Sequence, residues 1–316
     1  MKPLTDLPLI SRLSSSVIRI LGCNRGPMTL QGTNTYLVGT GTRRILVDAG
    51  EEKTANEYIK LLQEVLKKEN ATIEHLLITH YHLDHLGGVN YVLNMLKTLD
   101  VGGSSSTVWK LPRALEDAET TDPETKVQWQ ALKDKQIVEV EGAKICVEYT
   151  PGHTSDHACF MLENEEILFS GDCVLGEGTA IFEDLHTYLT SLKKMLAMKP
   201  KMIFPGHGPV IKEPEIIINQ YINHRLKREN EILDVLQRNT KDITLSEMDI
   251  VKHLYTDTSQ HLWQVAAYGV WRHLEKLSKE GRVKGEKGKW QKRPVSDTLQ
   301  QGERHLDAQE TFDGDK

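Results

Sequence analysis

The chain has 316 residues and a formal net charge of −6, which argues against a protein whose whole surface binds nucleic acid. Charged residues make up 27% and hydrophobic residues 39%, so the chain can build a substantial core and global disorder is excluded. This length is long for one domain and short for three, and therefore favours one larger and one smaller unit.

The cysteines indicate the redox compartment of the protein, and the length of the apolar runs indicates whether a segment can span a membrane. The four cysteines show no CxxC spacing, which indicates free thiols in a reducing compartment. No apolar run is long enough to span a bilayer, so no membrane partner is expected. Residues 1–16 lack the continuous apolar region of a secretory signal and match a mitochondrial presequence only weakly.

Strands and helices alternate through the first two hundred residues. A helix over 54–69 has apolar residues at helical spacing, and a second helix is predicted over 89–99. Residues 102–106 and 113–135 are expected to be loops. Strands are expected where short apolar runs end in turns, namely at 17–21, 36–38, 44–47, 75–78, 108–111, 139–140, 144–149, 167–169 and 202–204. This order predicts an α/β domain with sheets inside and helices outside.

Directly after the strand at 75–78, one short stretch concentrates the residues His80, His82, Asp84 and His85. Four polar side chains at one strand end would all need partners if buried, so packing alone gives little reason for this pattern. Imidazole and carboxylate groups suit zinc, iron and manganese. The stretch therefore predicts a metal site at the rim of a sheet.

Three later strand ends carry further candidate ligands, His153, Asp172 and His207, each next to a glycine where the backbone must turn. Any one of them alone would be interpreted as a surface residue. Their repetition at strand ends raises the probability that all of them are metal ligands. Asp48 also ends a strand. It either caps the following turn or fixes a metal-binding imidazole from behind.

Seven candidate ligands exceed the four of a single zinc ion, so two divalent ions are implied, with zinc preferred and manganese or iron also suited. Two such ions clamp an attacking hydroxide and a leaving oxygen, which predicts a hydrolase with Asp84, His82 and Asp172 as its catalytic residues. The natural division gives His80, His82 and His153 to one ion, Asp84, His85 and His207 to the other, and leaves Asp172 to bridge.

The motifs Thr-His-x-His-x-Asp-His, Pro-Gly-His-Thr, Ser-Gly-Asp and Pro-Gly-His-Gly, in this order, resemble the metallo-β-lactamase superfamily, and the segment at Asp48 resembles its first motif. The resemblance implies a four-layer αβ/βα sandwich with a dinuclear site at one edge between two sheets. It also implies the ligand set given above, residue by residue.

Four further segments, 21–24, 28–37, 171–179 and 221–225, resemble the animal beta-lactamase-like protein 2 family. Members of that family are described as endoribonucleases that act on single-stranded RNA, with a mitochondrial location. The resemblance therefore implies single-stranded RNA as partner and the mitochondrial matrix as compartment, with a cytoplasmic location as the alternative. Three polar residues in these segments are candidate substrate contacts: Asn34, His224 and Arg225.

From Pro214 onwards the pattern predicts three helices, over 216–236, from about 244 and over 262–279, with Ser246 and Asp249 as a capping pair. A wing strand containing Trp290 completes a winged-helix-like unit. The predicted organisation is an N-terminal extension (1–16), a metallo-β-lactamase-fold domain (17–212), a winged-helix-like domain (213–294) and a disordered polar tail (295–316).

Residues 276–293 contain eight Lys or Arg and two Glu, a local net charge of 8 − 2 = +6. This is either a phosphate-binding patch or a solvated helix end. Three functions remain open: an endoribonuclease that cleaves single-stranded RNA, a thioesterase of the glyoxalase II or acyl-carrier type, and a non-catalytic RNA-binding protein. The complete ligand set speaks against the third, since a relic site should have lost ligands.

Overall fold

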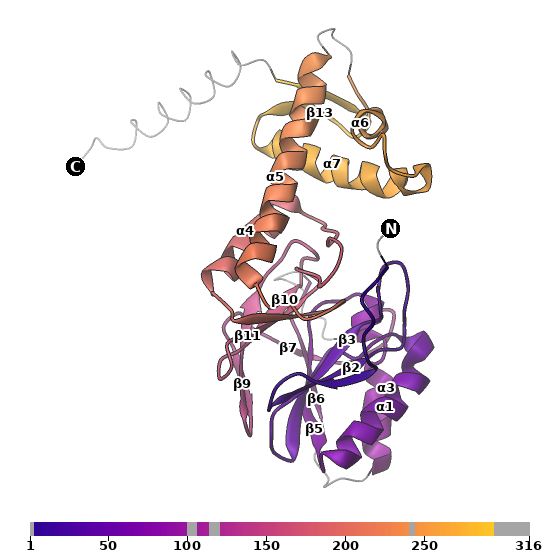
Figure 1. Ribbon diagram of the computed structural model, residues 1–316, viewed down its shortest axis with the longest axis vertical. Coiled ribbons are helices and arrows are strands. Elements are labelled where there is room, and N and C mark those ends of the chain that lie inside the picture. Colours follow the sequence, from indigo (N-terminus) through magenta and orange to yellow (C-terminus); the bar gives the residue numbers. More distant parts are fainter. Residues whose placement is uncertain (1–2, 100–105, 114–120, 240–243, 294–316) are drawn as a thin grey trace, which may run out of the picture. The chain divides into compact units, whose positions relative to one another are not determined.

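A computed structural model of the chain describes residues 3–99, 106–113, 121–239 and 244–293 (Figure 1). The chain forms two compact units, Met1–Glu183 with Thr187–Tyr221, and Asp184–His186 with Ile222–Lys316. The division falls beyond the boundary expected after residue 212, because the start of the long helix α5 belongs to the first unit. There Ile218 is fully buried, and the hydroxyl of Tyr221 accepts the N–H of Leu175 at 3.1 Å.

The first unit contains two sheets. In the first sheet β1 to β4 are antiparallel and β4 to β7 are parallel. Its strands, in spatial order, are β1 (Ile10–Arg12), β2 (Val17–Leu21), β3 (Asn34–Val38), β4 (Arg43–Val47), β5 (Thr72–Ile78), β6 (Thr107–Lys110) and β7 (Gln130–Ala131). The second sheet has the order β12 (Met202–Pro205), β11 (Ile167–Gly171), β10 (Ala158–Leu162), β9 (Ala143–Tyr149) and β8 (Ile137–Val140).

The two sheets pack face to face, and helices cover their outer sides. Along β4, Ile45 and Val47 contribute to the core between the sheets, whereas Leu46 faces the helices, as the two-residue period of a strand requires. Helices α1 (Ala55–Lys68) and α3 (Val89–Leu99) lie side by side against the first sheet (Figure 1). Helix α4 (Leu185–Ala197) lies beside the second sheet, since Ser191 and Tyr188 donate to the carbonyls of Pro151 after β9 and Cys173 after β11. These are the four layers that the sequence predicts.

Several elements were not predicted. Strand β1 falls in the expected N-terminal extension, where Ile10 pairs with Ile20, and its three residues are too few to show a period of two. The short apolar run of β10 is fully enclosed between β9 and β11, and so lacks the alternation by which a strand is recognised. Helix α4 and the two-residue β7 were also missed. The loop expected at 102–106 falls largely, and the polar tail fully, outside the described residues.

The second unit contains most of α5 (Pro214–Arg238), α6 (Glu247–Leu254), α7 (Trp263–Lys279) and the hairpin β13 (Val283–Glu286) and β14 (Lys289–Lys292). The predicted capping pair is confirmed, since Ser246 and Asp249 form a reciprocal capping box at the start of α6. Trp290 lies on β14, as expected, and its Nε1 donates to Glu247 at 2.8 Å. Within the described part of the chain, no helix has both the length and the apolar character needed to cross a membrane.

Candidate metal centre

Strand direction explains why residues distant in sequence meet at one place. Strands β4 and β5 are parallel, and β9, β11 and β12 also run in a common direction because β9 and β11 are both antiparallel to β10. The carboxyl ends of such strands lie at one edge of each sheet, where an α/β architecture presents its functional side chains. All seven candidate ligands follow these ends, and the structure brings all of them together.

The donor atoms form two groups. In each group the atoms lie within 4.8 Å of one another. The first group contains three imidazole nitrogens that lie 2.9 to 3.3 Å apart, with His82 contributing Nδ1 and the others Nε2. The members of the first group are His80, His82, His153 and Asp172, and those of the second are Asp84, His85 and His207. The six other residues divide as expected from the sequence, which left Asp172 outside both groups as a bridge.

Asp172 lies between the two groups. Its Oδ1 is 3.4 Å from Nε2 of both His85 and His207, and its Oδ2 is 3.7 Å from Nε2 of His153. Oδ1 is buried and makes no hydrogen bond to any described residue. A buried carboxylate oxygen without a hydrogen bond is costly, and a cation would satisfy it. Asp172 therefore has the position of a bridging ligand.

Hydrogen bonds to the outward-facing ring nitrogens also orient the histidines. In four of them the ring nitrogen that points away from the centre is hydrogen-bonded to a fixed oxygen, which sets the orientation of the ring and directs the free nitrogen inward. The pairs are His80 Nδ1 with Thr79 Oγ1 at 2.9 Å, His85 Nδ1 with Asp48 Oδ2 at 2.7 Å, His153 Nδ1 with the Ile181 carbonyl at 2.7 Å, and His207 Nδ1 with the Gly32 carbonyl at 3.3 Å. The residues present thus fit a pair of divalent cations.

Electrostatics differ between the two groups. Burial, followed by the neighbouring imidazoles, holds the pKa of His80 well below its usual range. Burial also lowers the pKa of His153, to about 3. Burial alone would lower the pKa of His207, but Asp172 and Asp84 raise it to about 9. The imidazoles of the first group therefore favour the neutral form that coordinates a metal, whereas a cation that binds in the second group would displace a proton from His207.

Asp48 has a left-handed backbone, with φ of 57°, and a buried carboxylate. The carboxylate accepts the N–H of Thr79 at 2.8 Å as well as the Nδ1–H of His85. The side chain thus joins the end of β4 to the ligand stretch after β5. Its contact with His85 is the one expected if Asp48 fixes a metal-binding imidazole.

The three candidate substrate residues lie in different surroundings. Asn34 is fully buried, and its Nδ2 donates to the carbonyls of Pro205 and Gly208, so it shapes the loop that carries His207 instead of offering a free amide at the surface. His224 is exposed on α5, whereas Arg225 is buried within the second unit. A substrate role for His224 and Arg225 stays a prediction.

The buried His157 also contributes to the site, and the sequence did not predict this. Its Nε2 accepts the backbone N–H of Asp172 at 3.2 Å, and its Nδ1 lies 3.0 Å from Thr150 Oγ1. The imidazole thus supports the turn that presents the bridging carboxylate. Its place four residues after His153, in the same loop, was the only available sign, since a single histidine has no pattern of its own.

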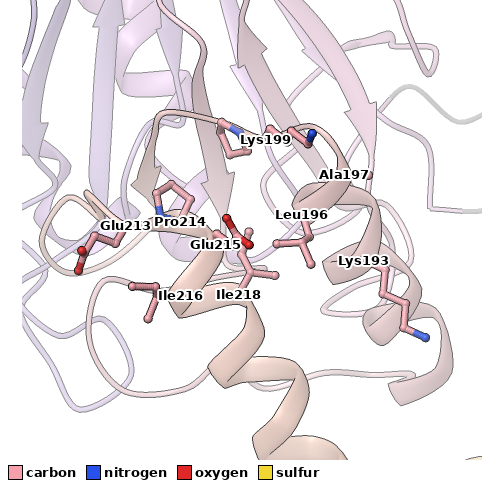
Figure 2. Close-up of a pocket in the computed structure, with 10 residues that line it drawn as sticks. Lys193, Leu196, Ala197, Lys199, Glu213, Pro214, Glu215, Ile216 and Ile218 are labelled. Atoms are coloured by element: carbon pink, nitrogen blue, oxygen red, sulfur yellow. The ribbon is translucent and has the colours of Figure 1, made fainter.

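A separate surface pocket of about 850 Å³ lies between the end of α4 and the start of α5 (Figure 2). None of the seven candidate ligands lines it. Its walls combine apolar side chains with two lysines and two glutamates: Lys193, Leu196, Ala197, Lys199, Pro200, Glu213, Pro214, Glu215, Ile216 and Ile218. The candidate chemistry is therefore confined to the sheet edge and does not extend to this pocket.

Comparison with known proteins agrees with this geometry. Residues 28–207 match the metallo-beta-lactamase superfamily, and residues 246–290 match the beta-lactamase associated winged helix domain. A Drosophila melanogaster protein named Beta-lactamase-like protein 2 homolog is 48% identical over 280 residues, which cover 88% of this chain and 93% of that protein.

Two further comparisons concern a sequence relative and a solved structure. An Aspergillus fumigatus protein named Atrochrysone carboxyl ACP thioesterase is 38% identical over 236 residues, which cover 75% of this chain and 70% of that protein. The crystal structure of a beta-lactamase domain protein from Burkholderia ambifaria, 19% identical, superposes with a TM-score of 0.72 over 90% of this chain and 93% of that one, which shows the common fold. The chain therefore belongs to the metallo-beta-lactamase superfamily of metal-dependent hydrolases, among the beta-lactamase-like protein 2 homologues, and it carries the associated C-terminal winged helix.

Proposed function

We propose that this protein is a two-metal hydrolase that cleaves single-stranded RNA endonucleolytically. The observation that carries the proposal is the position of Asp172, whose two carboxylate oxygens face two complete groups of donor atoms. Two divalent ions, zinc by donor preference, would supply when bound a water of lowered pKa and a double positive charge for the phosphoryl oxygens. The chain itself supplies position, desolvation and proton control.

Each ligand residue has a distinct task in this proposal. His80 and His153 are buried and would hold the first ion in a fixed position, because their outer nitrogens are fixed by hydrogen bonds. Asp84 is more open, with 23% of its side chain exposed, and its Oδ2 lies 3.1 Å from Nε2 of His207. Its exposed position suits it both to coordinate and to hold a proton of the attacking water. His82, like Asp84, is only partly buried.

The choice of RNA is supported by the winged-helix unit and by the family resemblance. Lys284, Lys287 and Lys289 are exposed on the hairpin formed by β13 and β14. Such a cluster attracts phosphates. The free positive charge of residues 276–293 is smaller than their net charge suggests, because the buried Glu229 forms ion pairs with Lys276 and Arg282, each at 2.6 Å.

A thioesterase is the second candidate. It is favoured by the Aspergillus fumigatus relative, whose name states that it acts on an acyl carrier protein. The same seven ligands would serve, since a carbonyl carbon and a phosphorus atom are both attacked by water activated between two cations. The ligand geometry is shared by the two reactions, so the substrate has to be determined by measurement.

The deciding experiment compares hydrolysis of a labelled single-stranded RNA with hydrolysis of an acyl thioester by the same metal-loaded protein, with and without chelator. Chelator-sensitive cleavage of RNA, together with thioester hydrolysis at the background rate, is the expected result. The reverse pattern would replace the proposal by the thioesterase. RNA binding without cleavage by either the wild-type protein or Asp84→Ala would identify a non-catalytic binding protein.

A further inference from the structure

An arginine stacks on an aromatic ring beside the ligand stretch. The guanidinium carbon of Arg113 lies 3.7 Å from the centroid of the Tyr81 ring. Tyr81 stands between two ligands in the sequence, and its ring centroid is 4.8 Å from that of His82. Strand topology accounts for this meeting, because β6 is parallel to β5 and its carboxyl end, which continues to Arg113, emerges at the same edge as the ligand stretch.

The ring that supports the arginine is itself fixed. The hydroxyl of Tyr81 donates to Glu183 Oε1 at 3.0 Å. The backbone N–H of Glu183 in turn bonds the carbonyls of Gly152 and His153, at 2.7 and 3.1 Å. Tyr81 is therefore tied to the loop that carries the ligand His153, so Arg113 is held at a defined distance from the centre and does not move freely over the surface.

The charge of Arg113 is available. The side chain is exposed and forms no ion pair with any described residue, whereas Arg43 at the start of β4 is paired with Glu74 at 3.1 Å. A guanidinium that stacks on a ring by its face leaves its N–H edge free, and that edge matches the oxygens of a phosphate. An exposed guanidinium that stacks on a residue of the ligand stretch, and has no ion-pair partner among the described residues, is available to a ligand at this edge of the sheet.

We propose that Arg113, held by Tyr81, is a specificity-determining residue that binds a phosphate adjacent to the scissile phosphodiester of single-stranded RNA. The inference rests on the proposed ribonuclease function and names the part of the site that recognises the substrate backbone. A substrate with a single phosphodiester would gain nothing from this contact, whereas an oligonucleotide would be positioned by it.

The test uses Arg113→Gln, with Arg43→Gln as a charge-matched control at the opposite end of the strands. The substrates are a short single-stranded oligoribonucleotide and bis(p-nitrophenyl) phosphate, which has no neighbouring phosphate. Arg113→Gln should lower the ratio of kcat/KM for RNA to kcat/KM for the small diester about tenfold, mainly through KM, as expected for one hydrogen bond to a charged group. Arg43→Gln should leave this ratio unchanged.

A binding measurement separates a substrate contact from a general structural effect. In an Asp84→Asn background, the affinity for a fluorescent oligoribonucleotide is measured against salt concentration. Loss of one phosphate contact should reduce the slope of log K against log salt by about 0.7 in Arg113→Gln, and Arg113→Lys should restore most of it.

Equal ratios and equal salt slopes for the Arg113 and Arg43 variants would overturn the inference while leaving the ribonuclease function intact. Failure of the wild-type protein to cleave or bind RNA, with the small diester still hydrolysed, would overturn both.

Discussion

Asp48→Asn tests whether the hydrogen bond behind His85 contributes to metal affinity. Asparagine is tolerated in the left-handed region that Asp48 occupies, with φ of 57°, so the backbone should not change. The amide keeps an oxygen that can accept the N–H of Thr79. What is lost is the negative charge that faces Nδ1 of His85 across 2.7 Å.

The size of the effect follows from burial. Asp48 is 2% exposed and His85 is fully buried, so water cannot replace the lost interaction. Removing an outer partner of this kind typically costs about 10- to 100-fold in metal affinity, or about 1.4 to 2.7 kcal/mol. The loss should fall on the ion held by Asp84, His85 and His207. The other ion should lose less, since Asp48 reaches His80 only through Thr79 Oγ1.

The assay is a zinc titration against a competing chelator of known affinity, with bound metal counted by elemental analysis. Asp48→Asn should lose one of two equivalents at a chelator concentration that leaves the wild-type protein with both. Asp257→Asn, a substitution of an exposed aspartate in the second unit, serves as the matched control. Unchanged affinity in Asp48→Asn, or an equal loss of both ions, would refute the reasoning.

Three further predictions concern catalysis and the winged helix. His82→Ala and Asp84→Ala should each abolish hydrolysis while circular dichroism and the melting temperature stay near wild type, and full activity in both would contradict the site assignment. Ser246→Ala removes a capping box and should lower the free energy of unfolding of the second unit by about 1 kcal/mol in denaturant titrations. Burial lowers the pKa of His273 from 6.5 to about 4 while its Nδ1 donates to the Gly269 carbonyl. The folded state therefore favours the neutral ring, and this stabilisation, complete above pH 6.5, should decline by up to about 3 kcal/mol as the pH falls towards 4. In His273→Gln this part of the pH dependence should disappear.

The ligand set was accessible from the sequence because each ligand follows directly on a buried strand. His153, Asp172 and His207 lie at strand ends, where a short apolar run and a glycine make the position recognisable. The division into two groups of ligands was also predictable from the sequence, because the ligand stretch supplies both groups: His80 and His82 belong to one, Asp84 and His85 to the other. The residues that hydrogen-bond to the ligands and orient them were less predictable from the sequence. Thr79 and His157 become visible only when the strands are aligned.

The residues that choose a substrate are the least predictable from sequence, for a physical reason. A metal ligand has a chemical signature that survives in isolation, whereas Arg113 is an ordinary exposed arginine until β6 is placed beside β5 and its guanidinium meets the Tyr81 ring. The same holds for the basic segment 276–293, where the sequence gives the charges but does not reveal that Glu229 forms ion pairs with both Lys276 and Arg282. Net charge therefore overstates the winged-helix patch and gives no indication of the exposed guanidinium that stacks on Tyr81 in the ligand stretch. If Arg113→Gln changes the salt dependence of RNA binding while Arg43→Gln does not, substrate choice in this protein depends on one stacked guanidinium more than on the total charge of its C-terminal unit.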